Sequence, residues 1–241
     1  MDNAIIFNKS IVLLTGADGG IGKCFIDELL KNDVKKIYIS GLNIDSLTEL
    51  SKKDKRLIPI KLDITSKEDI ENISKKCSDV NCLINNTGIE LKTDFLSKEF
   101  CQKFDKEIAV NFKGTINLTN EFIDVLKNNE KPLIINILSI ASLTFIDTIS
   151  SYCISKMALH IYCQYLRECK ETNSMKIFNI YPGYVDTSLV SDVLIDKISP
   201  EELVENICQE IKNGVFDVFP DNMSQTYRHS NKLKIDQFNY C

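Results

Sequence analysis

The sequence predicts an α/β fold: a doubly wound, mostly parallel sheet of about seven strands with helices on both faces. Two observations support this prediction. Short runs rich in Ile, Val and Leu alternate about six times with longer segments whose apolar residues recur every three or four positions. The short runs are compact and show no regular polar face, which is typical of parallel strands covered on both faces.

Each element follows from this alternation, taken in chain order. The strands are predicted at 10–16, 35–40, 56–63, 80–86, 132–139, 175–182 and 215–220. The helices are predicted at 20–33, 43–53, 66–77, 97–129, 150–173 and 199–213. No linker or repeat interrupts the series, so we expect one domain over 1–241, with a substrate-side loop at 182–199 and a C-terminal tail of uncertain structure at 221–241.

Composition and charge exclude several classes of protein. A formal net charge of −5 without a basic block argues against nucleic-acid binding. No apolar run approaches the length of a membrane span, and the first residues lack the features of a signal peptide. Nine scattered cysteines without a C-x-x-C pair and only two histidines predict reduced thiols in a cytoplasmic protein and no metal site.

A glycine-rich turn, "TGADGGIG" at 15–22, joins the first predicted strand to the first helix. Gly16 permits a tight turn, while Gly20 and Gly22 permit close approach of a ligand and of the helix to the sheet. The amides at such a helix start favour a pyrophosphate. A tight strand–helix turn without a ligand is the alternative, and the position in a doubly wound sheet favours the nucleotide.

The end of the second predicted strand leaves the choice between NAD(H) and NADP(H) open. An acid there binds the ribose 2′-hydroxyl of NAD, and an arginine suits the 2′-phosphate of NADP. The chain has Ser40, Gly41 and Leu42 at this point, so neither signal is present. Asp63, after the third strand, fits either an adenine site or a cap of the next turn.

Tyr152 and Lys156 stand four residues apart in a predicted helix and therefore share one of its faces. Taken alone, the pair fits a surface contact as well as it fits catalysis. A lysine beside a phenol favours the phenolate and so prepares the tyrosine for proton transfer. Ser139, at the end of the fifth predicted strand, offers a hydrogen-bond donor to a developing oxyanion.

Six motifs in register resemble those of the short-chain dehydrogenases/reductases. They are "TGADGGIG", "NNTG" at 85–88, Asn111 in "VNFKG", Ser139, "YCISK" and "PGYVDT" at 182–187. The resemblance spans almost the whole chain and implies a single-domain Rossmann oxidoreductase.

The resemblance also implies roles for individual residues. Tyr152 would be the general acid/base, Lys156 would bind the nicotinamide ribose and lower the tyrosine pKa, Ser139 would bind the substrate oxygen, and Asn111 would support a proton relay. The cofactor-binding set would be Thr15, Gly16, Asp18, Gly20, Ile21, Gly22, Asp63, Ile64, Asn85, Gly88, Tyr152, Lys156, Pro182, Gly183, Val185 and Thr187.

We therefore expect an NAD(P)-dependent alcohol dehydrogenase or carbonyl reductase that acts on a small or medium carbonyl or alcohol. Apolar residues of the 182–199 loop and of 142–150, such as Leu143, Phe145 and Ile146, would line its pocket. The alternative is a non-catalytic NAD(P)-binding sensor or scaffold on the same fold. An enoyl reductase fits less well, because its divergent members space tyrosine and lysine more widely. A homodimer or homotetramer is implied by the resemblance.

Overall fold

The computed structural model describes residues 7–190 and 194–235, with side chains as far as His229. Seven parallel strands form one sheet in the order β3-β2-β1-β4-β5-β6-β7. Their bounds are β1 Ile11–Thr15, β2 Lys36–Gly41, β3 Leu57–Lys61, β4 Cys82–Asn85, β5 Leu133–Ile137, β6 Lys176–Ile180 and β7 Asp217–Val218. The strand order reverses between β1 and β4, and a crevice that binds ligands is expected at this point.

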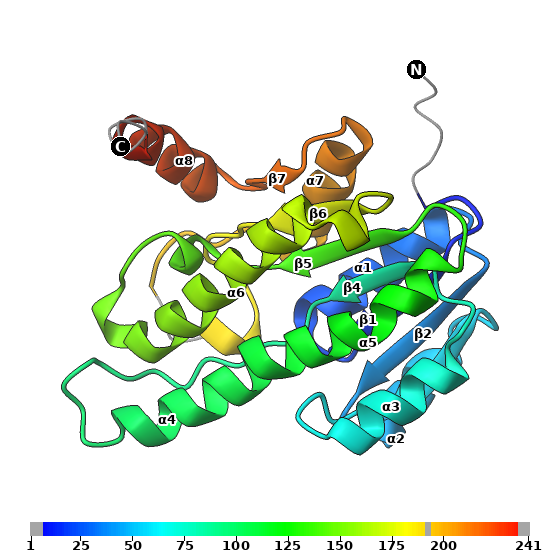
Figure 1. Cartoon of the computed structure of the whole chain (residues 1–241). Coiled ribbons are helices and arrows are strands. Elements are labelled where there is room, and N and C mark those ends of the chain that lie inside the picture. Colours follow the sequence, from blue (N-terminus) through cyan, green and yellow to red (C-terminus); the bar gives the residue numbers. More distant parts are fainter. Residues whose placement is uncertain (1–6, 191–193, 236–241) are drawn as a thin grey trace.

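Helices cover both faces of the sheet (Figure 1), and the bounds of the α-helices are α1 Gly20–Lys31, α2 Ile44–Ser51, α3 Lys67–Lys76, α4 Phe100–Glu107, α5 Thr115–Lys127, α6 Ser150–Glu168, α7 Pro200–Lys212 and α8 Asn222–Ile235. Strand residues alternate between two apolar cores. One core packs against α1, α2 and α7, and the other against α3, α5 and α6. The predicted α/β class is thereby confirmed.

The segment expected as one helix at 97–129 contains an interruption. Between α4 and α5 the chain forms a π-helical segment, η1 (Ile108–Gly114), with Asn111 near its centre. A Cβ on Gly114 would lie 2.7 Å from the carbonyl oxygen of Ile64, so only glycine lets η1 approach the turn after β3 this closely. π-Helical turns of this kind frequently occur at functional sites.

Two further boundaries differ from the sequence expectation. The helix expected at 150–173 ends at Glu168 and is followed by a short 3-10 turn, Lys170–Thr172. The tail at 221–241 contains α8, whose first residues pack beside the 182–190 segment. Among the described residues, no helix is long and apolar enough to cross a bilayer.

Candidate active site

The glycine turn has a backbone shape that glycine adopts readily and other residues do not, and it leaves the start of α1 open. Gly16 has a φ of +61°, which is unfavourable for other residues, and a Cβ on Gly22 would collide with the Gly16 carbonyl oxygen. Gly19, the N-cap of α1, offers no side chain to the first-turn amides, and this turn contains no acid. These amides are therefore available to an anion, so the turn fits a dinucleotide pyrophosphate.

Thr15 fastens the loop after β4 to this turn. Its buried Oγ1 accepts hydrogen bonds from the amides of Asn86 (2.9 Å) and Thr87 (3.0 Å). The Asn86 side chain donates back to the carbonyl oxygens of Thr15 and Gly16, at 2.9 and 3.0 Å. Sequence reasoning missed Asn86, although it stands in the same "NNTG" motif as Asn85. Thr15 thus positions the cavity wall without lining the cavity itself.

A cavity of about 320 Å³ runs from the glycine turn to the start of α6. It brings together twelve of the residues expected from the sequence: Gly16, Asp18, Gly20, Ile21, Gly88, Ser139, Tyr152, Lys156, Pro182, Gly183, Val185 and Thr187. It is also lined by Asn86, Glu90 and a group of apolar side chains that includes Ile146, Ile149, Leu189 and Val190. Leu143 and Phe145, expected in its wall, are not among the lining residues.

Ser139 lies in the turn that follows β5. Its backbone N–H donates to Ser142 Oγ at 3.2 Å, and its own Oγ accepts from Ala141 N at 3.1 Å. These contacts fix the side chain and leave its hydroxyl proton to point elsewhere. The hydroxyl lies close enough to the phenol of Tyr152 to lower its pKa. The two residues therefore present a pair of hydroxyl groups to one point in the cavity.

Tyr152 and Lys156 are both buried, and burial acts on both pKa values. It raises the pKa of the Tyr152 phenol, the charge of Glu90 raises it further, and the hydrogen bond with Ser139 opposes this rise. Burial lowers the pKa of Lys156 to about 8. The lysine Nζ lies 5.7 Å from the centre of the tyrosine ring and donates to the Ile137 carbonyl oxygen at 2.9 Å. Burial and the charge of Glu90 dominate the Tyr152 pKa, and the lowering expected from Lys156 stays a prediction.

Asn111 connects the loop after β4 to α6. Its Oδ1 accepts from Ile89 N (2.8 Å), and its Nδ2 donates to Ile89 O (2.9 Å) and to Ser155 Oγ (3.0 Å). The side chain is fully buried. Its amide is thus engaged with Ile89 and Ser155, and it sets the distance between Gly88 and α6. The proton relay expected of Asn111 remains a prediction.

The 182–190 segment forms another wall of the cavity. The methyl group of Thr187 packs over the glycine turn, where a Cβ on Gly20 would lie 2.8 Å from it. Behind the segment, Asp221 accepts a hydrogen bond from Gly183 N at 2.8 Å. Asp221 lies in the tail whose structure the sequence left uncertain, so its contribution had no signal in the sequence. Residues 191–193 of the expected substrate-side loop lie outside the described residues.

Comparison with known proteins places this geometry in a family. The family model for short chain dehydrogenases matches residues 10–197, well over half of the chain. A 3-oxoacyl-[acyl-carrier-protein] reductase from Rickettsia typhi is 31% identical over 219 residues, covering 90% of this chain and 87% of the relative. The chain belongs to the short-chain dehydrogenase family. It is accordingly an oxidoreductase.

Other relatives of this short-chain dehydrogenase differ in substrate and cofactor. An NADP-dependent 3-hydroxy acid dehydrogenase from Schizosaccharomyces pombe is 28% identical over 185 residues, covering 73% of this chain and 71% of the relative. A short chain dehydrogenase from Burkholderia cenocepacia, solved in complex with NADP, superposes with a TM-score of 0.88 at 25% identity over 94% of each chain. A Burkholderia phymatum enzyme in complex with NAD has the same fold, with a TM-score of 0.82 at 17% identity over 95% of this chain and 96% of that one.

Some expected cofactor residues of the dehydrogenase lie away from the cavity. The Asp63 carboxylate accepts hydrogen bonds from Thr65 N (2.8 Å) and Thr65 Oγ1 (2.6 Å), which are the contacts of a turn cap. Ile64 is buried in the core on the α3 and α5 face. The contacts of Asp63 thus match the second of the two alternatives that the sequence left open.

Asn85 belongs to a row of amides that crosses the sheet of the dehydrogenase. Its Nδ2 donates to Asn136 Oδ1 at 2.9 Å, and Asn136 Nδ2 donates to Asn179 Oδ1 at 3.0 Å. These three residues lie opposite one another on β4, β5 and β6, and Asp217 continues the register on β7. Asn85 therefore organises the sheet beneath the cavity and does not line the cavity.

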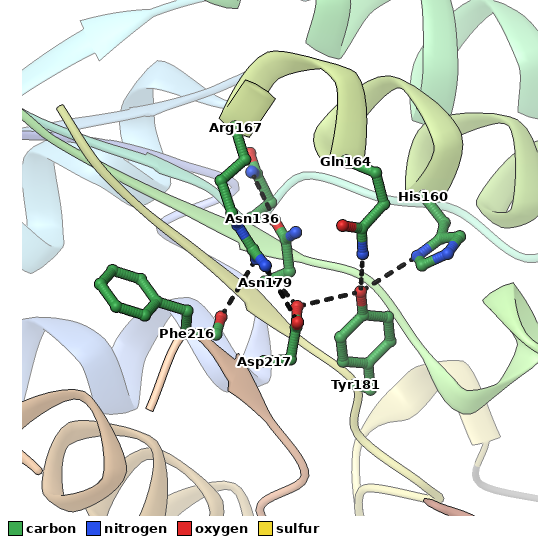
Figure 2. A network of polar contacts seen from close by, with 8 residues as sticks. All are labelled: Asn136, His160, Gln164, Arg167, Asn179, Tyr181, Phe216 and Asp217. Carbon is green, nitrogen blue, oxygen red and sulfur yellow. Dashed lines mark hydrogen bonds and ion pairs between the residues drawn. The ribbon is translucent and has the colours of Figure 1, made fainter. Parts of the chain in front are cut away.

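Polar contacts next to this row of amides hold the second half of α6 in place (Figure 2). Arg167 makes a two-point ion pair with Asp217, at 2.9 and 2.8 Å. His160 Nδ1 and Gln164 Nε2 contact the Tyr181 hydroxyl, at 3.0 and 3.4 Å. Because these side chains follow Lys156 at helical spacing, they fix the rotation of α6 and thereby the positions of Tyr152 and Lys156. His160 therefore has a structural environment.

Proposed function

We propose that the chain catalyses reversible hydride transfer between a nicotinamide dinucleotide and a small or medium carbonyl or alcohol. The proposal rests above all on one arrangement: Tyr152, Ser139 and Lys156 line the same cavity as the open start of α1. The residues of the glycine turn fit the dinucleotide, which supplies the hydride donor or acceptor when bound. All other steps fall to the side chains of the protein.

The proton transfer is assigned to Tyr152. During carbonyl reduction its phenol gives a proton to the oxygen that gains negative charge, and during alcohol oxidation its phenolate takes that proton back. The Ser139 hydroxyl donates a hydrogen bond to the same oxygen and reaches the phenol as well. Lys156, held by the Ile137 carbonyl, directs its ammonium group towards the cavity and opposes the burial penalty on the phenolate.

The substrate end of the cavity favours uncharged molecules. Its wall is formed by apolar side chains such as Ile146, Ile149 and Val190, with the carboxylate of Glu90 beside Tyr152 and Tyr184. Removing the charge of an acidic substrate from water against such an apolar wall is unfavourable. We therefore expect a neutral ketone, aldehyde or alcohol rather than a free carboxylic acid.

Turnover can be measured by nicotinamide absorbance against a panel of ketones, aldehydes and alcohols. The wild type should turn over at least one class, and Tyr152→Phe should lower kcat by about 10²–10⁴-fold while retaining dinucleotide binding. Tyr165→Phe is a matched control, because this exposed tyrosine of the same helix faces away from the cavity. Tight dinucleotide binding without turnover of any panel member would favour a sensor or scaffold instead.

We also propose that the protein forms a homodimer or homotetramer in the cytoplasm. Ile161 and Tyr165 expose apolar surface on the outer face of α6, at 67% and 66% of their full areas. The eight cysteines in the described part of the chain are all free thiols, which suits a reducing compartment. Light scattering of the wild type and Ile161→Lys tests the assembly: the substitution should dissociate an α6 interface, and a monomeric wild type would contradict it.

A further inference from the structure

The carboxyl end of β2 is the position where related folds discriminate between NAD and NADP. An acid at this point binds the ribose 2′-hydroxyl, whereas an arginine nearby accommodates the 2′-phosphate. In this chain β2 ends at Gly41, which has no side chain, and the exposed Leu42 follows. The next polar side chain, Asn43, uses its oxygen to cap α2 by accepting from Asp45 N and Ser46 N.

Another carboxylate lies over this vacant position. Asp18 Oδ1 is 2.9 Å from the point where a Cβ on Gly41 would stand, and its Cγ is 3.6 Å away. The backbone enforces this proximity, since Ala17 N donates to the Ser40 carbonyl oxygen at 3.0 Å and so ties the glycine turn to the end of β2. A side chain on Gly41 and the present position of Asp18 are therefore mutually exclusive.

The Asp18 carboxylate is also available to a ligand. It is half-buried and lines the cavity near the start of α1. Within the described residues, its side chain has no hydrogen bond or ion pair. A partly desolvated carboxylate at this point needs a hydrogen-bond donor, and vicinal ribose hydroxyls supply two.

We propose that Asp18 replaces the missing acid of β2 and makes the protein selective for NAD(H) over NADP(H). Its carboxylate accepts hydrogen bonds from the adenosine ribose hydroxyls and repels a 2′-phosphate. This inference rests on the proposed function, because it requires a dinucleotide in the cavity. It sets the chain apart from the two relatives whose names specify NADP.

A positive charge on the neighbouring strand, Lys61, could favour a 2′-phosphate instead. It lies directly opposite Gly41 in the β2–β3 register and is exposed to solvent. Lys61 ends β3, which lies two strands away from β1, the strand that Asp18 follows. Solvent screens an exposed lysine, while Asp18 is partly buried at the cavity wall. The carboxylate should therefore have the larger effect on the selectivity between NAD(H) and NADP(H). The experiment includes Lys61 for this reason.

Calorimetric titration of the full chain with NADH and with NADPH measures the ratio of the two binding affinities and needs no turnover. The wild type should bind NADH at least about tenfold more tightly, a difference of about 1.4 kcal/mol. Asp18→Asn should remove most of this ratio by weakening NADH and strengthening NADPH. Asp45→Asn, which removes an acid of the first turn of α2, serves as the charge-matched control and should leave the ratio unchanged.

A transplanted acid provides the sharpest test. In Asp18→Ala/Gly41→Asp, the new side chain occupies the space that Asp18 leaves, where the next neighbour of a Cβ is Leu47 Cδ1 at 3.8 Å. This double variant should recover the preference for NADH that Asp18→Ala alone loses. The recovery would show that the location of the carboxylate matters, and not merely the loss of a side chain.

Three results would overturn the inference. Equal or tighter binding of NADPH by the wild type, with the preference abolished by Lys61→Gln, would assign selectivity to the lysine. An unchanged ratio in Asp18→Asn would remove Asp18 from the choice while leaving the proposed hydride transfer intact. Failure of both dinucleotides to bind would overturn this inference together with the proposed function.

Discussion

Asp221 holds Gly183 in place: its Oδ2 accepts the backbone N–H of Gly183 at 2.8 Å, and its Oδ1 accepts that of Ser224 at 2.9 Å. The buried carboxylate thus links the start of α8 to a segment that lines the cavity. The C-terminal region is therefore part of the support of the candidate active site.

Replacing this carboxylate should loosen the cavity wall. Asp221→Ala leaves the amides of Gly183 and Ser224 without their partner, at a cost of about 1–3 kcal/mol in the free energy of unfolding. The KM for cofactor should rise more than kcat falls, since the change affects binding and not proton transfer. Urea denaturation and steady-state kinetics measure both effects. Asn222→Ala, at the exposed neighbouring position, is the control, and equal behaviour of the two variants would contradict the assigned support.

Glu90 should shift the pH profile of the reaction. Burial raises the pKa of Tyr152, and the negative charge of Glu90 raises it further, so Glu90→Gln should lower this pKa. Because alcohol oxidation needs the phenolate, the rise of kcat/KM with pH should move to lower pH in the variant. An unmoved profile, measured against Glu99→Gln on the exposed N-cap of α4, would show that Glu90 does not act on Tyr152.

Lys156 should make stability depend on pH in a defined window. Its pKa is lowered from 10.5 to about 8 by burial, so between these values the unfolded chain binds more protons than the folded chain. Stability relative to Lys156→Met should therefore rise with pH through this window, by about 3 kcal/mol at most. Chemical denaturation at both ends of the window tests the prediction. The exposed Lys98→Met should show no such change, and a pH-independent difference for Lys156→Met would refute the prediction.

Gly114 should be sensitive to a single methyl group. A Cβ there would lie 2.7 Å from the Ile64 carbonyl oxygen and 3.1 Å from that of Ala109, so Gly114→Ala should cost about 1–3 kcal/mol through overpacking. The displaced η1 segment carries Asn111, so turnover should fall as well. Gly214→Ala places a methyl group in open space at a φ of +79° and should cost about 1 kcal/mol with turnover intact. Normal turnover in Gly114→Ala would show that the position of η1 does not affect catalysis.

The strands and their parallel order were largely predictable from the sequence. Runs such as Ile11–Thr15 and Leu133–Ile137 are mostly apolar and fully buried, which is typical of parallel strands covered by helices on both faces of the sheet. Strand ends were predicted one or two residues too long, except at the carboxyl end of β2, because polarity does not mark where a hydrogen-bond ladder stops. The π-helical segment was not predicted, because its cause is a tertiary contact between Gly114 and Ile64.

The candidate site was predictable where several motifs stand in register along the chain. Ser139, Tyr152 and Lys156 line one cavity, as the motifs suggested. Asn85 and Asp63 were harder, because buried amides and turn-capping carboxylates resemble ligand-binding groups in sequence. Whether an amide faces a neighbouring strand or a cavity depends on strand register, which a single sequence does not reveal.

The row formed by Asn85, Asn136 and Asn179 has a consequence for how the sheet assembles. Parallel strands made of Ile, Leu and Val can pair in shifted registers with similar apolar burial. A slip of two residues would place each buried amide opposite an apolar side chain and cost about 1–3 kcal/mol for every group left without a partner. The amide row thus selects one alignment during folding. It brings the carboxyl ends of three strands to a common level, from which the chain leads to Gly88, Ser139 and Pro182.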